Sequence, residues 1–104
     1  MNGKRKHERY SYEQDVEIIH EDGQLTSGRL INFSLGGAFI ALSPQPEFGS
    51  KIVLQLNLPG VPDLCKIPCF VRWTKPDYGV GIQFEYTRPI EIWALIKLIH
   101  KLQE

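Results

Sequence analysis

The 104-residue sequence has no long hydrophobic run, no histidine cluster, no repeat and no excess of charge of either sign. No apolar stretch approaches the ~20 residues that a membrane-spanning helix needs. No apolar segment follows the basic N-terminus, as one would in a secretory signal. Twelve basic and twelve acidic residues give a formal net charge of +0, which disfavours a broad basic surface for nucleic acid. The composition is that of one small globular domain, expected in the cytoplasm.

Cysteine is also scarce, because only Cys65 and Cys69 occur. If LCKIPCFVRW is a strand, their Cα atoms lie ~13 Å apart at ~3.3 Å per residue, beyond the ~7 Å that a disulfide allows. The three histidines are scattered, with no metal-ligand spacing. We therefore expect two buried thiols, no disulfide, no metal and no cofactor.

Motifs for catalysis are missing as well. Ser34 lies in NFSLGG, which is not the G-x-S-x-G nucleophile elbow, and no histidine has a matching context. The glycines of SLGGAF and YGVGIQF have the spacing of neither a P-loop nor a dinucleotide fingerprint. The protein is predicted to bind a ligand or partner and not to be an enzyme.

Short segments of alternating hydrophobicity, separated by turn residues, make up most of the sequence. KIVLQLNL alternates apolar and polar side chains, which is typical of a half-buried strand. In the next segment the alternation places Trp73 on one face with Cys65, Ile67, Cys69 and Val71. The pattern predicts a mainly β protein, a small antiparallel barrel of about six strands within residues 15–86.

The hydrophobic period changes after Thr87, and the new period predicts a helix over residues 89–103. Thr87 is the predicted N-cap, and Pro89 suits the first turn. Trp93 and Leu98 fall outside the predicted apolar stripe, so the helix either is deeply buried or also covers a partner or a second copy. The stripe consists of Ile92, Leu95, Ile96, Ile99 and Leu102.

The N-terminal segment 1–11 is polar and basic, without hydrophobic periodicity, and is predicted to be a flexible arm before a domain over 12–104. Within it, Arg5 and Arg9 have the spacing R-x-x-x-R. The planar fork of arginine bonds phosphate oxygens in pairs and reads the O6/N7 edge of guanine. Taken alone, this spacing fits a solvated basic tail better.

A second cluster is NFSLGG, residues 32–37, between two predicted strands. Asn32 and Ser34 alternate onto one face, so that an amide and a hydroxyl point together. Gly36 and Gly37 allow a tight turn and close approach of a ligand. Taken alone, the cluster fits a β-turn whose Asn and Ser bond only the backbone.

Together the two clusters are more specific than either. R-x-x-x-R, a gap of about two strands, and N-x-S-x-x-G resemble the PilZ family of bacterial cyclic di-GMP receptors, whose pattern is R-x-x-x-R followed by D/N-x-S-x-x-G. FVRW (70–73) and YGVGIQF (78–84) resemble the later strands of that family, so the resemblance covers essentially the whole chain. The matching residues are Arg5, Arg9, Asn32, Ser34 and Gly37.

The resemblance implies a six-stranded antiparallel β-barrel with one C-terminal helix and an arginine arm that folds over cyclic di-GMP. It implies that Arg5 and Arg9 clamp guanine edges and phosphates. Asn32 and Ser34 would bond the guanine or a nearby phosphate, and Gly37 would provide room. Secondary ligand contacts are expected from Lys4, Lys6 and Gly36. Trp73 either lies near the ligand or is a core tryptophan on the inward face. Lys4 stands where the family tunes the number of bound ligands, one or two per chain.

Three functions are consistent with the sequence. The paired motifs favour a stand-alone cyclic di-GMP receptor, in which the ligand orders the arm and changes the contact with an unidentified protein partner in trans. The alternative is a PilZ-like interaction module that binds a protein through its helix and needs no nucleotide. A third is a small barrel that uses its basic arm on RNA or DNA, which the net charge disfavours. The helix is also a candidate surface for self-association.

Overall fold

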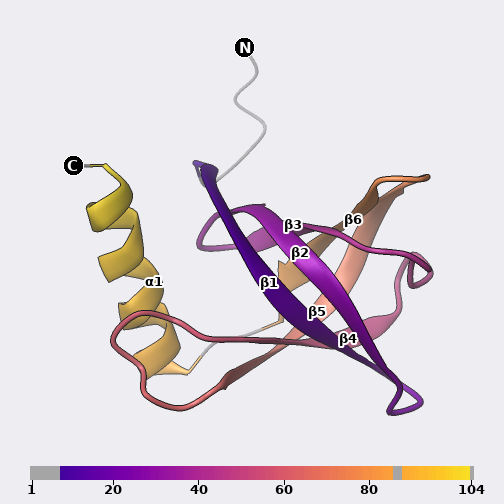
Figure 1. Ribbon diagram of the computed structural model, residues 1–104, viewed down its shortest axis with the longest axis horizontal. Helices are drawn as coiled ribbons and strands as arrows, with labels where there is room; N and C mark the ends of the chain where they lie inside the picture. The colour runs from indigo at the N-terminus through magenta and orange to yellow at the C-terminus, as the bar shows by residue number, and fades with distance from the viewer. Residues whose placement is uncertain (1–7, 86–87, 104) are drawn as a thin grey trace.

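The computed structural model describes residues 8–85 and 88–103, and within them the chain forms six strands and one helix. The elements are β1 (Tyr10–His20), β2 (Leu25–Phe33), β3 (Gly37–Ala41), β4 (Lys51–Leu56), β5 (Cys65–Lys75), β6 (Gly79–Phe84) and α1 (Pro89–Leu102). The strands pair antiparallel in the order β1-β2-β3-β6-β5-β4, and β4 pairs with β1 to close the barrel (Figure 1). The predicted six-stranded antiparallel barrel with a C-terminal helix is confirmed.

The strands fill the barrel with every second side chain. In β4, Ile52, Leu54 and Leu56 are buried, as their alternation predicts. Cys65 and Cys69 of β5 are both free and fully buried. Burial raises the pKa of the Cys69 thiol to about 12 and also raises the pKa of Cys65, which lies near the Glu91 carboxylate. Both cysteines are therefore neutral core residues.

The first strand begins earlier than the sequence indicates. β1 starts at Tyr10 and not near residue 15, so Tyr10 and Ser11 belong to the barrel and not to the arm. The rings of Tyr10 and Tyr12 each lie with their centroids 6.0 Å from that of Phe33. These aromatic contacts supply the apolar packing that the polar sequence around them does not suggest.

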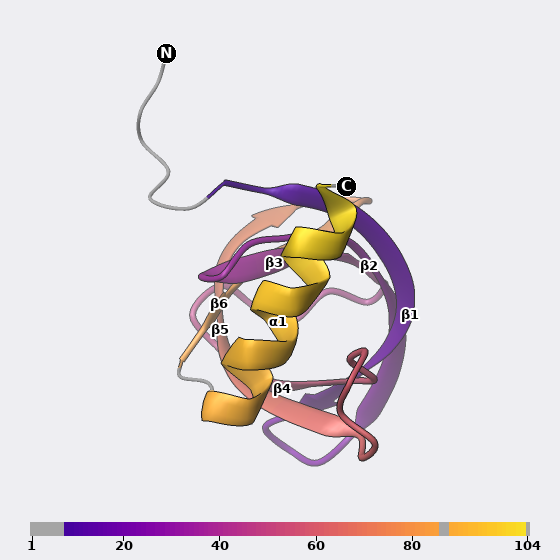
Figure 2. The same ribbon diagram turned by 90° about the vertical axis from the view of Figure 1, so that its left-hand side faces the viewer.

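Helix α1 lies across one end of the barrel (Figure 2). Its N-cap is Arg88, so the prediction of Thr87 as the N-cap is wrong; Thr87 itself lies outside the described residues. The Glu91 carboxylate accepts hydrogen bonds from the Arg88 backbone N–H at 3.2 Å and from its guanidinium at 2.9 Å. Glu91 is only 1% exposed, so this ion pair helps to set which side of the helix faces the barrel.

The rotation of α1 differs from the predicted stripe. Leu98 is buried, whereas Ile92, Ile96 and Leu102 are exposed. The helix is apolar on nearly all sides, so hydrophobic periodicity alone does not determine which side packs inward. The apolar residues that face the barrel are Ala94, Leu95, Leu98 and Ile99.

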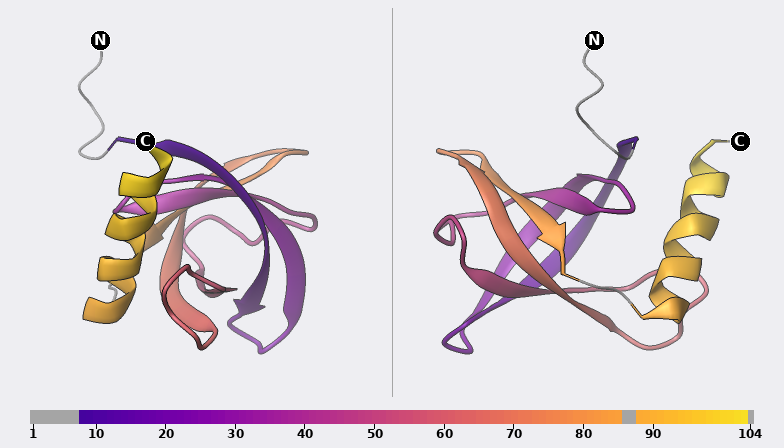
Figure 3. Two further views of the ribbon diagram at one scale, coloured as in Figure 1. Left: turned by 60° about the vertical axis from the view of Figure 1, so that its left-hand side comes forward. Right: turned by 180° about the vertical axis from the view of Figure 1, so that it is seen from behind.

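The barrel separates two groups of loops. The β3–β4 loop lies at the end of the barrel away from α1, and the β5–β6 turn is also remote from the helix (Figure 3). The N-terminal end of β1 and the C-terminal end of α1 both lie toward the top of the view in Figure 1. No helix in the described part of the chain is long and apolar enough to cross a membrane.

Candidate functional site

A line of directly paired residues crosses the outside of the barrel. Ser11 pairs with Asn32, Asn32 with Phe39, Phe39 with Gly81, and Gly81 with Trp73. These residues belong to β1, β2, β3, β6 and β5 in that order. Side chains of directly opposed residues point to the same face of a sheet. These five residues therefore lie side by side on the outer surface of the barrel. We call these five residues the outer row.

Trp73 reaches the outer row through a β-bulge. The register between β5 and β6 shifts between Val71 and Trp73, so that β5 carries one extra residue. An extra residue reverses the alternation of side chains beyond it. Val71 is fully buried and Trp73 is 42% exposed. The prediction that Trp73 shares the inward face of Val71 is therefore wrong.

Gly81 allows the Trp73 indole to lie flat across β6. A Cβ atom at position 81 would collide with the indole ring. The ring thereby reaches Phe39, two strands away, and stacks on it with centroids 5.3 Å apart and an interplanar angle of 21°. Phe39 and Trp73 together form an aromatic floor that is open to solvent.

Arg9 lies at the other side of this floor, directly before β1. Its Nη1 donates a hydrogen bond of 2.8 Å to Oδ1 of Asn32. A hollow of about 250 Å³ lies between the guanidinium and the rings. We call this the arginine hollow; its lining residues are Arg9, Tyr10, Ser11, Asn32, Phe39 and Trp73. A guanidinium beside flat rings suits a planar, negatively charged ligand. The guanidinium bonds anionic groups, and the aromatic rings stack on bases.

The rest of the second motif forms a turn next to the arginine hollow. The Ser34 hydroxyl accepts hydrogen bonds from the N–H groups of Gly36 at 3.0 Å and Gly37 at 3.2 Å, and Ser34 is 7% exposed. The Ser34 hydroxyl is thus bonded within its own turn, whereas the Asn32 side chain bonds Arg9. A Cβ at Gly37 would collide with the Ile82 carbonyl oxygen, so this glycine lets β3 approach β6.

The structure thus brings together Arg9, Asn32 and Trp73 from three different parts of the sequence. Lys4, Arg5 and Lys6 lie outside the described residues. Sequence reasoning missed Phe39 and the role of Gly81. The alternating glycines of YGVGIQF were the available signal for Gly81, because a glycine inside a strand marks close approach of another group.

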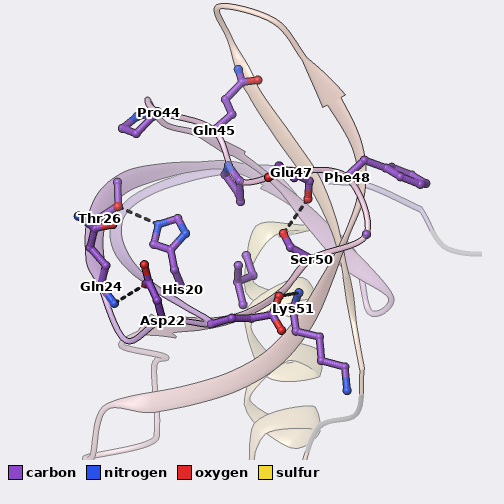
Figure 4. Close-up of a pocket in the computed structure, with 14 residues that line it drawn as sticks. His20, Asp22, Gln24, Thr26, Pro44, Gln45, Glu47, Phe48, Ser50 and Lys51 are labelled. Atoms are coloured by element: carbon purple, nitrogen blue, oxygen red, sulfur yellow. Dashed lines mark hydrogen bonds between the residues drawn. The ribbon is translucent and has the colours of Figure 1, made fainter.

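A larger hollow, of about 670 Å³, lies at the opposite end of β1 between the β1–β2 turn and the β3–β4 loop (Figure 4). We call it the acidic hollow, because Glu21, Asp22 and Glu47 line it and Lys51 is the one lysine or arginine among its described lining residues.

The polar groups of the acidic hollow largely bond one another. His20 Nε2 lies 2.8 Å from Thr26 Oγ1, and the Ser50 hydroxyl donates to the Glu47 carbonyl oxygen at 2.6 Å (Figure 4). The Gln24 N–H donates to the Asp22 carboxylate at 2.9 Å. These contacts hold the turn and the loop in place. Among the described residues, no group of three or more His, Cys, Asp or Glu side chains is placed to hold a metal ion.

Comparisons with known proteins show the fold and the family of the chain. No curated protein sequence matches the chain. Several solved structures share its fold. The PilZ domain of CeSA from a cellulose-synthesizing bacterium is 18% identical, with a TM-score of 0.68, over 93% of this chain and 99% of that one. The PilZ domain of YcgR from Escherichia coli, solved with cyclic di-GMP, is 16% identical, with a TM-score of 0.75, over 96% and 92%.

A third structure is longer than this chain. MotI (DgrA) from Bacillus subtilis, an inhibitor of motility, is 20% identical, with a TM-score of 0.75. The match covers 98% of this chain but 52% of MotI, so this chain spans about half of that protein. The family model described as "PilZ domain" matches residues 3–101. Because that match spans nearly the whole sequence, the chain belongs to the PilZ domain family.

Proposed function

We propose that this protein is a cyclic di-GMP receptor that binds its ligand at the arginine hollow. The observation that carries the proposal is the Arg9–Asn32 hydrogen bond beside the stacked Phe39 and Trp73 rings. PilZ domains such as that of YcgR bind cyclic di-GMP, which supports the ligand assignment. The family's function is ligand binding and regulation, so we propose no catalytic residue.

The chemistry of the hollow suits each part of this ligand. Cyclic di-GMP carries two phosphate charges and two guanine bases. The Arg9 fork bonds a phosphate or the O6/N7 edge of a guanine. The Trp73 ring stacks on a base, a contact that contributes about 1–3 kcal/mol in other proteins. Asn32 holds Arg9 in position and turns its amide toward the base edge.

The N-terminal segment completes the site in this proposal. A hollow of about 250 Å³ is smaller than most ligand pockets, which measure ~300–1,000 Å³. We therefore propose that Arg5 covers the remainder of the ligand, and that Lys4 and Lys6 add electrostatic attraction. The cost of ordering this segment is offset by charge-assisted hydrogen bonds. One or two ligand molecules bind per chain.

The turn after β2 contributes through its geometry. The Ser34 oxygen already accepts two N–H groups, and its hydroxyl proton is the part that a ligand phosphate would receive. Gly36 and Gly37 keep this turn tight enough for the ligand to approach. The ligand-bound form then acts on a protein partner in trans, in the cytoplasm.

Titration calorimetry with cyclic di-GMP tests the proposal, and we expect binding near micromolar ligand. Cyclic di-AMP and cyclic GMP–AMP in parallel titrations test preference, and the same curves give stoichiometry. The Arg9→Ala protein is the control for the site. Absence of heat with folded protein would contradict the receptor and favour the alternative, a PilZ-like interaction module that needs no nucleotide.

A further inference from the structure

The outward side of α1 exposes large apolar side chains. Ile92, Trp93 and Ile96 are 41%, 47% and 37% exposed, and we call them the helix face. They lie on the side of the helix away from Ala94 and Leu98, which pack on the barrel. Figure 2 shows no other helix or strand of the described chain over the outer side of α1. Single exposed hydrophobic residues are ordinary, but adjacent ones on one helix face mark an interaction surface.

Trp93 is held in place at the edge of the helix face. Gly60, with φ +87°, lies in the β4–β5 loop, and a Cβ there would be 3.2 Å from Trp93 Cζ3. A hollow of about 520 Å³ opens between this loop and α1. We call it the basic groove; Pro59, Gly60, Trp93, Lys97, His100 and Lys101 line it. An indole fixed against backbone is a rigid anchor, the kind of residue that dominates protein interfaces.

The charge of this surface has one sign. Lys97 Nζ lies 5.4 Å from the centroid of the Trp93 ring, and Lys101 follows one turn later. No acidic side chain occurs among the described residues that line the groove. The acid of the described helix, Glu91, is buried and bonded to Arg88. The surface therefore combines apolar anchors with uncompensated positive charge.

We propose that the helix face and the basic groove bind an acidic segment of another protein. Apolar side chains of that segment cover Trp93 and its neighbours, and its carboxylates meet Lys97 and Lys101. This inference names a partner surface for the proposed receptor, yet it does not require the nucleotide. Binding at the arginine hollow and binding here are therefore separable.

Charge selects this partner over two other occupants. A second copy of the chain would bring Lys97 and Lys101 against the same residues, because a two-fold interface pairs identical surfaces, and like charges oppose contact. Anionic membranes attract clusters of about 4–8 Lys or Arg, whereas the basic groove holds two lysines and a histidine. An acidic protein segment satisfies both the charge and the apolar anchors.

The test is selection from a phage-displayed random peptide library on the full chain, without nucleotide. We expect enriched peptides that combine Asp or Glu with Leu, Phe or Trp. The affinity of these peptides for the Lys97→Glu/Lys101→Glu protein should be about tenfold lower than for the unchanged protein. Their affinity for the unchanged protein should weaken as the salt concentration rises. Lys75→Glu is the matched control, because Lys75 ends β5 and its Nζ lies 4.8 Å from the ring centroid of Tyr78. The β5–β6 turn that follows lies away from α1 (Figure 3).

Four results would overturn the proposal. The first is that no acidic, apolar peptides are enriched. The second is that enriched peptides bind the Lys97→Glu/Lys101→Glu protein with unchanged affinity. The third is a dimer in sedimentation velocity that Trp93→Ala abolishes, and the fourth is charge-dependent binding to phosphatidylserine vesicles. Because Trp93→Ala also removes packing on Gly60, the exposed lysines carry the peptide test. Calorimetry with cyclic di-GMP on the double variant should give unchanged affinity, so failure of either proposal is recognised separately.

Discussion

The arginine hollow and the acidic hollow lie at opposite ends of β1, and we propose the smaller one as the ligand site. The acidic hollow measures about 670 Å³ and the arginine hollow about 250 Å³. Three carboxylates line the first, whereas a guanidinium, an amide and two stacked rings line the second. Carboxylates oppose a phosphate and a guanidinium attracts it. For a dianionic nucleotide, we therefore expect side-chain chemistry, and not volume, to decide between the two hollows.

Glycines near the two hollows also have different structural roles. At the site end, Gly37 has no room for a side chain because Ile82 lies against it. At the far end, Gly49 has a φ of +84°, and a Cβ added there would have no atom within 4 Å. The first glycine permits close strand packing, and the second permits a left-handed turn.

This contrast predicts the largest effect. Gly37→Ala should lower the free energy of unfolding by about 3 kcal/mol or more, because the new methyl group overpacks the β3–β6 contact. Gly49→Ala should cost about 1–2 kcal/mol, the usual cost of a left-handed conformation for alanine. Denaturant unfolding measures both values. Equal losses would show that β3 and β6 separate at little cost.

The next largest effect concerns the guanidinium. Arg9→Ala should weaken cyclic di-GMP binding about 10-fold to 150-fold in calorimetry, since charge-assisted hydrogen bonds contribute about 1.5–3 kcal/mol. We expect a similar loss for Arg5→Ala. Arg29→Ala is the matched control, because Arg29 is exposed on β2 and bonds Glu13 and Asp15 at 3.1 Å and 2.6 Å. Unchanged affinity in both motif variants would contradict the arginine clamp while leaving the fold intact.

Much of the fold could be predicted because its signals are local. The alternation of β4 and the change of period before α1 come directly from side-chain spacing. The face of Trp73 could not be predicted, because a bulge shifts the register without a sequence signal of its own. The rotation of α1 was equally hidden, since Ile92 and Leu98 are alike in hydrophobicity and only packing distinguishes them.

The site shows the same division. Arg9 and Asn32 were predicted together from the paired motifs, and the structure joins them by a hydrogen bond. Phe39 was missed because its contact with Trp73 crosses an intervening strand. This contact requires both Gly81 and the bulge in β5. The sequence separation of Phe39 and Trp73 indicates neither of them.

Trp73 should contribute a smaller but clear share of ligand affinity. Trp73→Ala should weaken cyclic di-GMP binding about tenfold, through loss of base stacking, and Trp73→Phe should retain most of it. Trp93→Ala on the helix face serves as the control and should leave affinity unchanged. In a Trp93→Phe background, ligand should change the fluorescence of Trp73. A silent spectrum with normal calorimetry would place the base elsewhere.

Asn32 should have a weaker effect than the aromatic floor. Asn32→Ala removes one hydrogen bond to Arg9, and such a bond contributes about 0.5–1.5 kcal/mol. We therefore expect a threefold to tenfold loss of affinity, to a first approximation. Asn32→Asp should keep Arg9 in place through an ion pair. A loss in Asn32→Ala as large as that in Arg9→Ala would show that the amide contacts the ligand as strongly as the guanidinium does.

The smallest effect is expected from the acidic hollow, where Glu47→Lys reverses a charge. The two ends of β1, an 11-residue strand, lie about 33 Å apart at ~3.3 Å per residue. The Debye length at physiological ionic strength is about 8 Å, so the new lysine is screened from a ligand at the arginine hollow. Cyclic di-GMP affinity should therefore change less than about twofold at that ionic strength and somewhat more at low salt. A large gain that persists at high salt would mean that the ligand binds in the acidic hollow, and the size of a cavity would then have been the better guide.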